Sequence, residues 1–135
     1  SEMCIRDSYY IVQMDLSYNR FNKFPFEALY IQTLRSIAVR HQRDADGYRC
    51  MKEWPTNVAT CPVLQRLFLG GNDIGEVPET EEISYRIYIL DISDNPEIVI
   101  NVSAVCPYIT AGMYTLIYDS WQNIRGCPAL KLENK

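Results

Sequence analysis

The stretch LQRLFLGGNDIGEVP, residues 64–78, decides the fold of this chain. Large apolar residues fill its first, fourth and sixth positions, an asparagine fills the ninth, and a proline closes it. Leu67 and Leu69 are two residues apart, so they lie on one face of a short strand while Phe68 between them faces the other way. We therefore predict a strand with one buried face, followed by a turn made by the glycines, the asparagine and the proline.

The same pattern recurs along the chain at a fixed interval. Residues 11–25, IVQMDLSYNRFNKFP, agree with it at every template position. A further copy starts at Ile87, 23 residues after Leu64, and another at Leu34 starts 23 residues after Ile11. Because a single strand cannot bury its apolar face alone, the copies are predicted to stack as neighbouring turns with their strands in a parallel sheet.

The shared pattern, L-x-x-L-x-L-x-x-N-x-L-x-x-L-P with L for any large apolar residue, resembles that of leucine-rich repeat proteins. The resemblance implies an α/β solenoid with a parallel sheet on the concave face and irregular or short helical returns on the convex face. We expect repeats over residues 11–112, starting near 11, 34, 64 and 87, and a last degenerate repeat with a C-terminal cap over 113–135. Residues 1–10 begin with SEMCIRDS, which is similar to a translated sequencing adapter, and are expected to be a non-native leader.

Asparagines follow the strand in three copies, at Asn19, Asn72 and Asn95. A chain that leaves a buried parallel strand still carries amide and carbonyl groups that need partners. Because a side-chain amide is both donor and acceptor, we predict an internal asparagine ladder that bonds successive turns. Gln42 occupies this place in the second copy, and its side-chain amide is expected to take the asparagine's part in the ladder. Trp121 occupies it in the last copy and cannot accept a hydrogen bond, so we expect that copy to close the stack.

Two copies depart from the regular spacing. The starts at Leu34 and Leu64 are 30 residues apart instead of 23, and the seven extra residues are predicted to form a loop at residues 43–49, RDADGYR. The last copy can start at Ile109 or at Met113. We prefer Met113, because the residues after it then match the strand pattern.

Side chains that alternate with the buried ones are predicted to line the concave surface, where repeat proteins of this shape commonly bind a macromolecule. Phe68 is the most informative of them, because it is a large apolar ring expected to point outward. Several others belong to types that are enriched in binding hot spots or that make adjustable polar contacts. The residues predicted to bind a partner are Tyr18, Arg40, His41, Arg66, Phe68 and Asp91.

The sequence lacks the residue combinations that catalysis or metal binding would need. His41 is the only histidine, and no nucleophile elbow is present. Asp15 and Asp91 belong to strands about 15 Å apart, too far for a carboxylate pair. A calcium site at Asp91 and Asp94 is disfavoured, because its other oxygen ligands are not identifiable. We expect no catalytic site, no metal and no cofactor.

Composition narrows the classes of partner. The net charge is −4 and the basic residues are scattered, so nucleic acid is not expected as a partner. No apolar run approaches the roughly 18 residues of a transmembrane helix. We expect one domain, as a monomer or part of a longer chain, whose partner is a protein or a glycan.

The cysteines leave the redox compartment open. Cys61, Cys106 and Cys127 are each followed by proline just before a strand, and we expect them to be buried thiols in equivalent places. A disulfide between Cys106 and Cys127 is the less favoured alternative. No role is assigned to Cys4, and the state of Cys50 is not predicted.

A narrower resemblance covers the last part of the chain. Residues 105–130, VCPYITAGMYTLIYDSWQNIRGCPAL, look like the closing segment of surface leucine-rich repeat proteins from anaerobic gut bacteria. This resemblance implies an exported, lipid-anchored bacterial protein, extracellular or on the cell surface, with a role in adhesion or recognition. We therefore expect a noncatalytic binding module. The alternative is a structural spacer or capping segment of a larger protein, with no ligand of its own.

Overall fold

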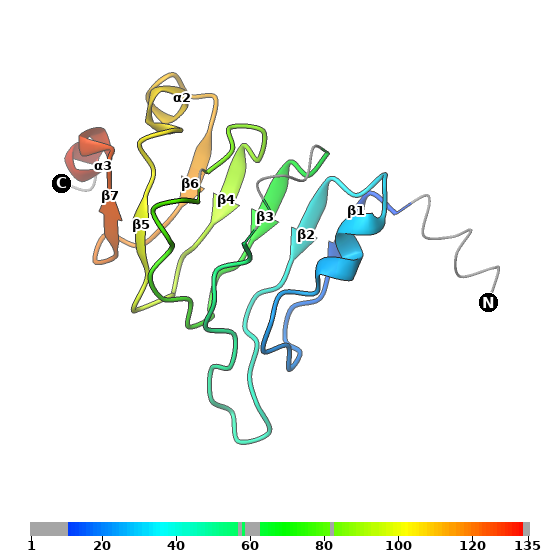
Figure 1. Cartoon of the computed structure of the whole chain (residues 1–135). Coiled ribbons are helices and arrows are strands. Elements are labelled where there is room, and N and C mark those ends of the chain that lie inside the picture. The colour runs from blue at the N-terminus through cyan, green and yellow to red at the C-terminus, as the bar shows by residue number, and fades with distance from the viewer. Residues whose placement is uncertain (1–10, 57, 59–62, 82, 134–135) are drawn as a thin grey trace.

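The computed structural model describes residues 11–56, 58, 63–81 and 83–133. They form a solenoid in which successive turns lie side by side and each adds one strand to a five-stranded parallel sheet (Figure 1). The strands follow one another in the sheet in chain order. They are β1 (Gln13–Asp15), β2 (Ser36–Ala38), β3 (Arg66–Phe68), β4 (Ile89–Asp91) and β6 (Thr115–Ile117). The predicted solenoid with a parallel sheet is therefore confirmed.

The strands pair so that one apolar residue of each copy joins a continuous row inside the solenoid. Leu67 pairs with Ile37 on one side and with Leu90 on the other, and none of the three is more than 1% exposed. Leu116 pairs with Leu90 and extends the row into β6, which is the alignment obtained when the last copy starts at Met113. Burial of this row is the main apolar contribution to the stability of the sheet.

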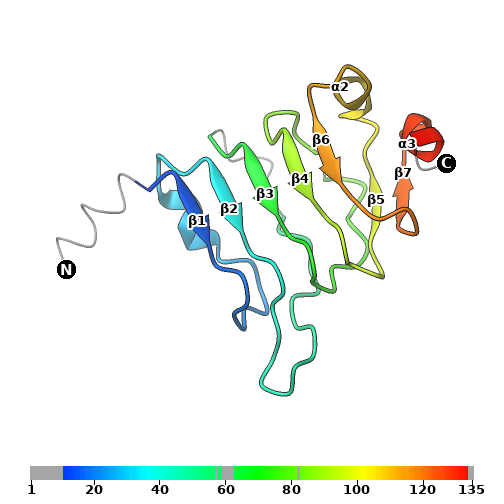
Figure 2. The same ribbon diagram turned by 180° about the vertical axis from the view of Figure 1, so that it is seen from behind.

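The return segments run behind the sheet and contain little regular structure (Figure 2). Short helices occur as predicted: the 3-10 helix η1 (Phe26–Tyr30), and the α-helices α2 (Cys106–Thr110) and α3 (Pro128–Glu133). A second parallel sheet, of β5 (Val99–Asn101) and β7 (Asn123–Arg125), was not predicted. It forms because each of these segments has an isoleucine between two outward residues, which is strand periodicity on the returning side of a turn.

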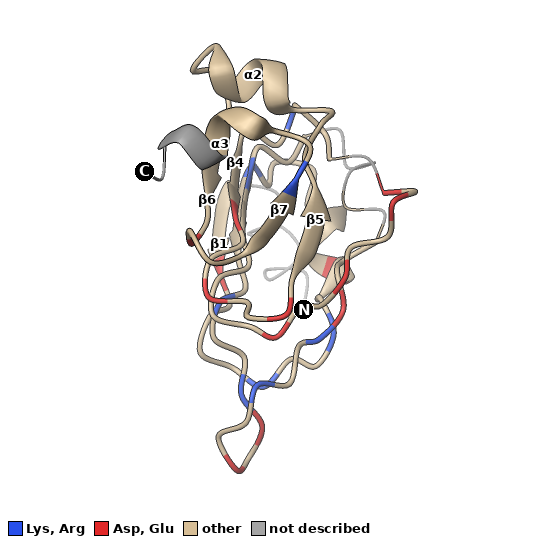
Figure 3. Ribbon diagram, turned by 90° about the vertical axis from the view of Figure 1, so that its left-hand side faces the viewer, with Lys and Arg blue, Asp and Glu red and all other residues tan. Residues whose placement is uncertain are grey.

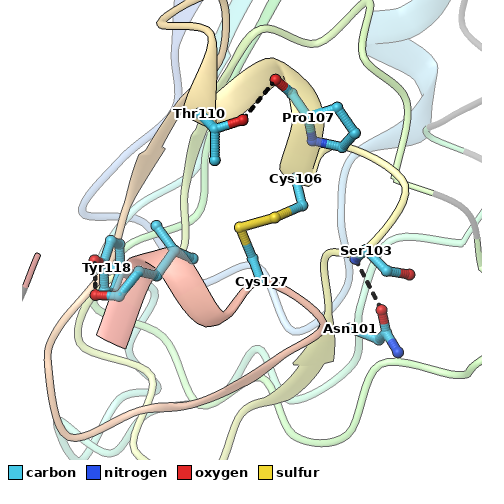
Figure 4. The surroundings of a disulfide bond; sticks show 8 residues. Asn101, Ser103, Cys106, Pro107, Thr110, Tyr118 and Cys127 are labelled. Atoms are coloured by element: carbon cyan, nitrogen blue, oxygen red, sulfur yellow. Dashed lines mark hydrogen bonds between the residues drawn. A yellow bond between two sulfur atoms is a disulfide. The ribbon is translucent and has the colours of Figure 1, made fainter. Parts of the chain in front are cut away.

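A disulfide closes the C-terminal end of the stack. Cys106 begins α2, Cys127 directly precedes α3, and their Cα atoms are 5.3 Å apart (Figure 4). The expectation of buried thiols is therefore wrong for this pair, because the two helices bring the cysteines together. Cys50 is free and half-buried, and its Sγ lies 3.3 Å from the carbonyl oxygen of Phe21. Cys61 and residues 1–10, with Cys4, lie outside the described residues.

Candidate functional site: the sheet face and the strand ends

Buried amides bond each turn to the one before it. Asn72 is fully buried, and its Nδ2 donates to the carbonyl oxygens of Val39 (2.8 Å), in the preceding turn, and of Leu69 (2.9 Å). Its Oδ1 accepts the backbone N–H of Gln42 at 3.0 Å. A single side chain thus bonds two carbonyls and one amide of the backbone, although the Leu69 carbonyl also accepts from Asn95.

Asn95 and Gln42 repeat this arrangement in neighbouring turns. Asn95 donates to the carbonyl of Leu69 at 3.1 Å and accepts the backbone N–H of Ile74 at 3.0 Å. Gln42 donates to the carbonyl of Leu16 at 3.0 Å. Both side chains are 0% exposed. Gln42 therefore fills the asparagine place with a longer arm.

The two ends of the ladder differ from the sequence prediction. Asn19 is exposed, and its amide bonds only within its own turn, to the carbonyls of Leu16 (2.8 Å) and Ser17 (3.3 Å), because no described turn precedes it. At the other end Trp121 is 58% exposed, and Gln122 donates to the carbonyl of Ile92 in the preceding turn at 2.7 Å. The ladder therefore continues into the last copy, one residue later than expected.

The outer face of the five-stranded sheet, here called the sheet face, is the surface predicted to be concave. At its centre Arg40 extends over Phe68 with its guanidinium carbon 4.5 Å from the ring centroid. Its Nε donates to Oδ2 of Asp91 at 2.9 Å. Arg40 follows β2, Phe68 ends β3 and Asp91 ends β4, so this central cluster spans three turns.

Asp91 lies underneath this cluster and does not reach the surface. It is only 3% exposed, and its Oδ1 accepts both the backbone N–H of Ser93 (3.0 Å) and the Ser93 hydroxyl (2.7 Å). Asp91, which the sequence placed among the partner-binding residues, is thus buried beneath Arg40 and not open to solvent. Its carboxylate instead holds Arg40, whose side chain stays 38% exposed.

The remaining predicted residues form two separate contacts. Tyr18, which is 78% exposed, stacks on His41 with ring centroids 4.8 Å apart. The His41 ring lies against Gly71, whose missing side chain leaves room for it. Arg66 lies at the opposite end of the strands, where its Nη1 donates to the hydroxyl of Tyr88 at 3.3 Å. The six predicted residues thus do not form one cluster.

Residues just before the ladder positions adopt the left-handed backbone conformation, with φ of 60° at Tyr18, 53° at His41, 75° at Gly71 and 51° at Asp94. This region is costly for a residue other than glycine. Its recurrence shows that the turn geometry after each strand is imposed by the solenoid and is not chosen by the local sequence.

The predicted loop at residues 43–49 is a hairpin that projects beyond the ends of the strands (Figure 3). Arg43 at its base donates to the carbonyl of Gly71 at 2.6 Å. Arg49, on the other arm, donates to the carbonyls of Asn72 and Asp94, each at 2.7 Å. The insertion therefore bonds the strand ends of two following turns, a role the sequence did not reveal.

The pKa values of Asp15 and Tyr114 depart from their usual values. Hydrogen bonds from the hydroxyl and the backbone N–H of Ser17 hold the pKa of Asp15 below its usual value. Burial raises the pKa of Tyr114, whose hydroxyl has no hydrogen-bond partner among the described residues. In the described part of the chain, no three histidine, cysteine or acidic side chains gather as metal ligands. No described helix has the length and apolar character to cross a bilayer.

Parallel strands stacked one per turn, with buried amides bonding each turn to the next, define a leucine-rich repeat solenoid. Two solved structures are similar to this chain. A leucine-rich repeat protein from Bacteroides thetaiotaomicron VPI-5482 is 52% identical with a TM-score of 0.85, over 90% of this chain and 14% of that one. A leucine-rich repeat protein from Bacteroides eggerthii DSM 20697 is 52% identical with a TM-score of 0.84, over 91% of this chain and 20% of that one.

This chain therefore spans a fifth or less of the length of either protein. No protein-family model and no curated protein matches it.

Proposed function

We propose that this chain is a noncatalytic recognition module that binds a protein or a glycan through the sheet face. The observation that carries the proposal is the guanidinium of Arg40, which Phe68 and Asp91 fix in one orientation at the centre of that face. Only Nε is bonded to Asp91, so the two terminal nitrogens remain available to a ligand. A held arginine stacked on an aromatic ring loses little conformational entropy on binding, which favours affinity.

Apolar side chains beside this cluster extend the proposed surface. Ile117 pairs in register with Asp91 across the sheet and is 38% exposed, while Phe68 is partly exposed. An aromatic and aliphatic patch next to a fixed arginine is the composition of a binding hot spot.

Export to the bacterial surface is part of the same proposal. The Cys106–Cys127 disulfide supports it, because disulfides persist mainly in oxidising compartments. The similarity to two Bacteroides proteins supports a bacterial setting.

The test uses an array of glycans and purified extracellular proteins probed with the purified chain, followed by variants on the ligand found. Phe68→Ala combined with Arg40→Ala should weaken binding by about tenfold or more, with the unfolding midpoint little changed. Arg125→Ala on β7, behind the sheet, is the matched control and should bind normally. Binding that survives the sheet-face substitutions, or that is absent from the whole array, would favour the spacer function instead.

A further inference from the structure

Arginines gather where the strands begin, at the opposite edge from the hairpin. Arg35 directly precedes β2, Arg66 begins β3, and Arg86 lies shortly before β4, so one arginine lies at or near the start of each of three neighbouring strands. None of the three makes an ion pair with another described residue, whereas Arg40 and Arg49 do. In a chain with a net charge of −4, this edge is a local exception to the overall charge.

A pocket of about 360 Å³ opens between two of these arginines. It is lined by Arg35, Val63, Leu64, Gln65 and Arg86, and no acidic side chain is among these residues. We call it the strand-start pocket.

Backbone contacts hold this pocket in shape. The carbonyl oxygen of Arg35 accepts the backbone N–H groups of Gln65 (2.8 Å) and Arg66 (3.0 Å). The Arg35 side chain donates through Nη1 to the carbonyl of Gln32 at 3.1 Å, and no other bond of its guanidinium is present among the described residues. Most of its donors therefore remain available to an anion in the pocket.

We propose that the strand-start pocket binds an acidic polysaccharide built from uronic-acid units, whose carboxylates are held by Arg35 and Arg86, with Arg66 contacting an adjoining unit. This inference rests on the proposed function and names its ligand. Arginine matches a carboxylate with two parallel hydrogen bonds, and a site whose described lining has two arginines and no acidic side chain favours anionic over neutral sugars.

The pocket favours a polysaccharide over an acidic peptide because a sugar carboxylate is held on a rigid ring. It therefore loses less conformational entropy on binding than a flexible glutamate side chain does. Val63, which is partly exposed, also gives the pocket an apolar part, against which the C–H face of a sugar ring can pack.

The experiment is affinity electrophoresis of the 135-residue chain in gels containing polygalacturonate, with poly-L-glutamate, dextran sulfate and neutral dextran as separate arms. The unaltered chain should be retarded by polygalacturonate, and more weakly as salt is raised. Arg35→Gln combined with Arg86→Gln should weaken this binding by about tenfold or more. Arg125→Gln removes the same kind of charge from β7 and should leave retardation unchanged.

Each other outcome overturns the inference. Equal retardation by poly-L-glutamate or dextran sulfate would show a general response to polyanions. Retardation by neutral dextran, or polygalacturonate binding unaffected by the double substitution, would show that the arginines do not select the ligand. Thermal unfolding of the double variant verifies that it is folded. If polygalacturonate does not bind while the Phe68→Ala and Arg40→Ala substitutions still weaken capture of an array ligand, this inference fails and the proposed function stands.

Discussion

Arg40 reaches across one intervening strand to Asp91, placing its Nε 2.9 Å from the Asp91 carboxylate. The two residues are far apart in the sequence, and the side chain of Phe68 between them supports the guanidinium. The solenoid thus fixes a charged group on its sheet face by using three turns at once. This arrangement makes the orientation of Arg40 depend on a residue that no ligand can touch.

The two residues of the Arg40–Asp91 ion pair should contribute unequally to the free energy of unfolding. Asp91→Ala should lower the free energy of unfolding by about 2–3 kcal/mol, because it leaves the partly buried N–H and hydroxyl of Ser93 without their acceptor. Arg40→Ala should cost no more than about 1 kcal/mol, because the Arg40 side chain is partly exposed and the ion pair is screened by solvent. Urea unfolding of both variants measures the difference, and equal losses would contradict this account.

The stability lost when an asparagine of the ladder is replaced should depend strongly on its position. Asn72→Ala should destabilise the chain by about 3 kcal/mol, since it leaves the carbonyls of Val39 and Leu69 and the N–H of Gln42 short of a partner. Asn19→Ala is the control and should cost within about 0.5 kcal/mol, because Asn19 is exposed. Chemical unfolding compares the two, and a costly Asn19→Ala would show that the first turn is more strongly tied than the structure indicates.

The sequence predicted the features that recur in every turn. It missed the contacts that single side chains make across several turns. The strand row and the buried amides follow from a fixed period, because every turn faces the same need to bury one face and satisfy its backbone. The burial of Asp91 could not be predicted, since it depends on the reach of Arg40 over two strand spacings. The shift from Trp121 to Gln122 was missed because the longer glutamine arm accommodates one extra residue in the turn, so its Oε1 accepts the N–H of Asp119 at 2.8 Å.

Gly71 combines two constraints, a left-handed φ and a close neighbour, which among the glycines it shares with Gly126 alone. Its φ of +75° is unfavourable for residues with a side chain, and a Cβ added there would overlap the ring of His41. Gly71→Ala should therefore cost about 2–4 kcal/mol. Gly47→Ala in the hairpin has a similar φ of +84° but open space around it, so about 1 kcal/mol is expected.

Adding His41→Ala to the Gly71→Ala variant separates these constraints. Removal of the ring should restore the part of the stability that was lost to overlap, leaving only the backbone cost. Thermal and urea unfolding of the single and double variants give this coupling, and a strictly additive result would mean that the overlap contributes nothing.

The Cys106–Cys127 disulfide should carry a large share of the stability of the C-terminal turn. It joins residues 21 apart, and closing a loop of this size is worth about 3 kcal/mol through the unfolded state. The Cys106→Ser and Cys127→Ser double variant should therefore unfold at a lower urea concentration. The loss of stability should appear first as faster hydrogen exchange in β7, which lies next to α3 in Figure 1.

A control and a direct measurement complete this test. Cys50→Ser should leave the unfolding midpoint nearly unchanged, because that thiol is free. Mass measurement after alkylation without reductant should find Cys106 and Cys127 protected and Cys50 modified. Alkylation of Cys106 in the folded, air-oxidised chain would show that the bond is absent, and the argument for an oxidising compartment would then lose its structural support.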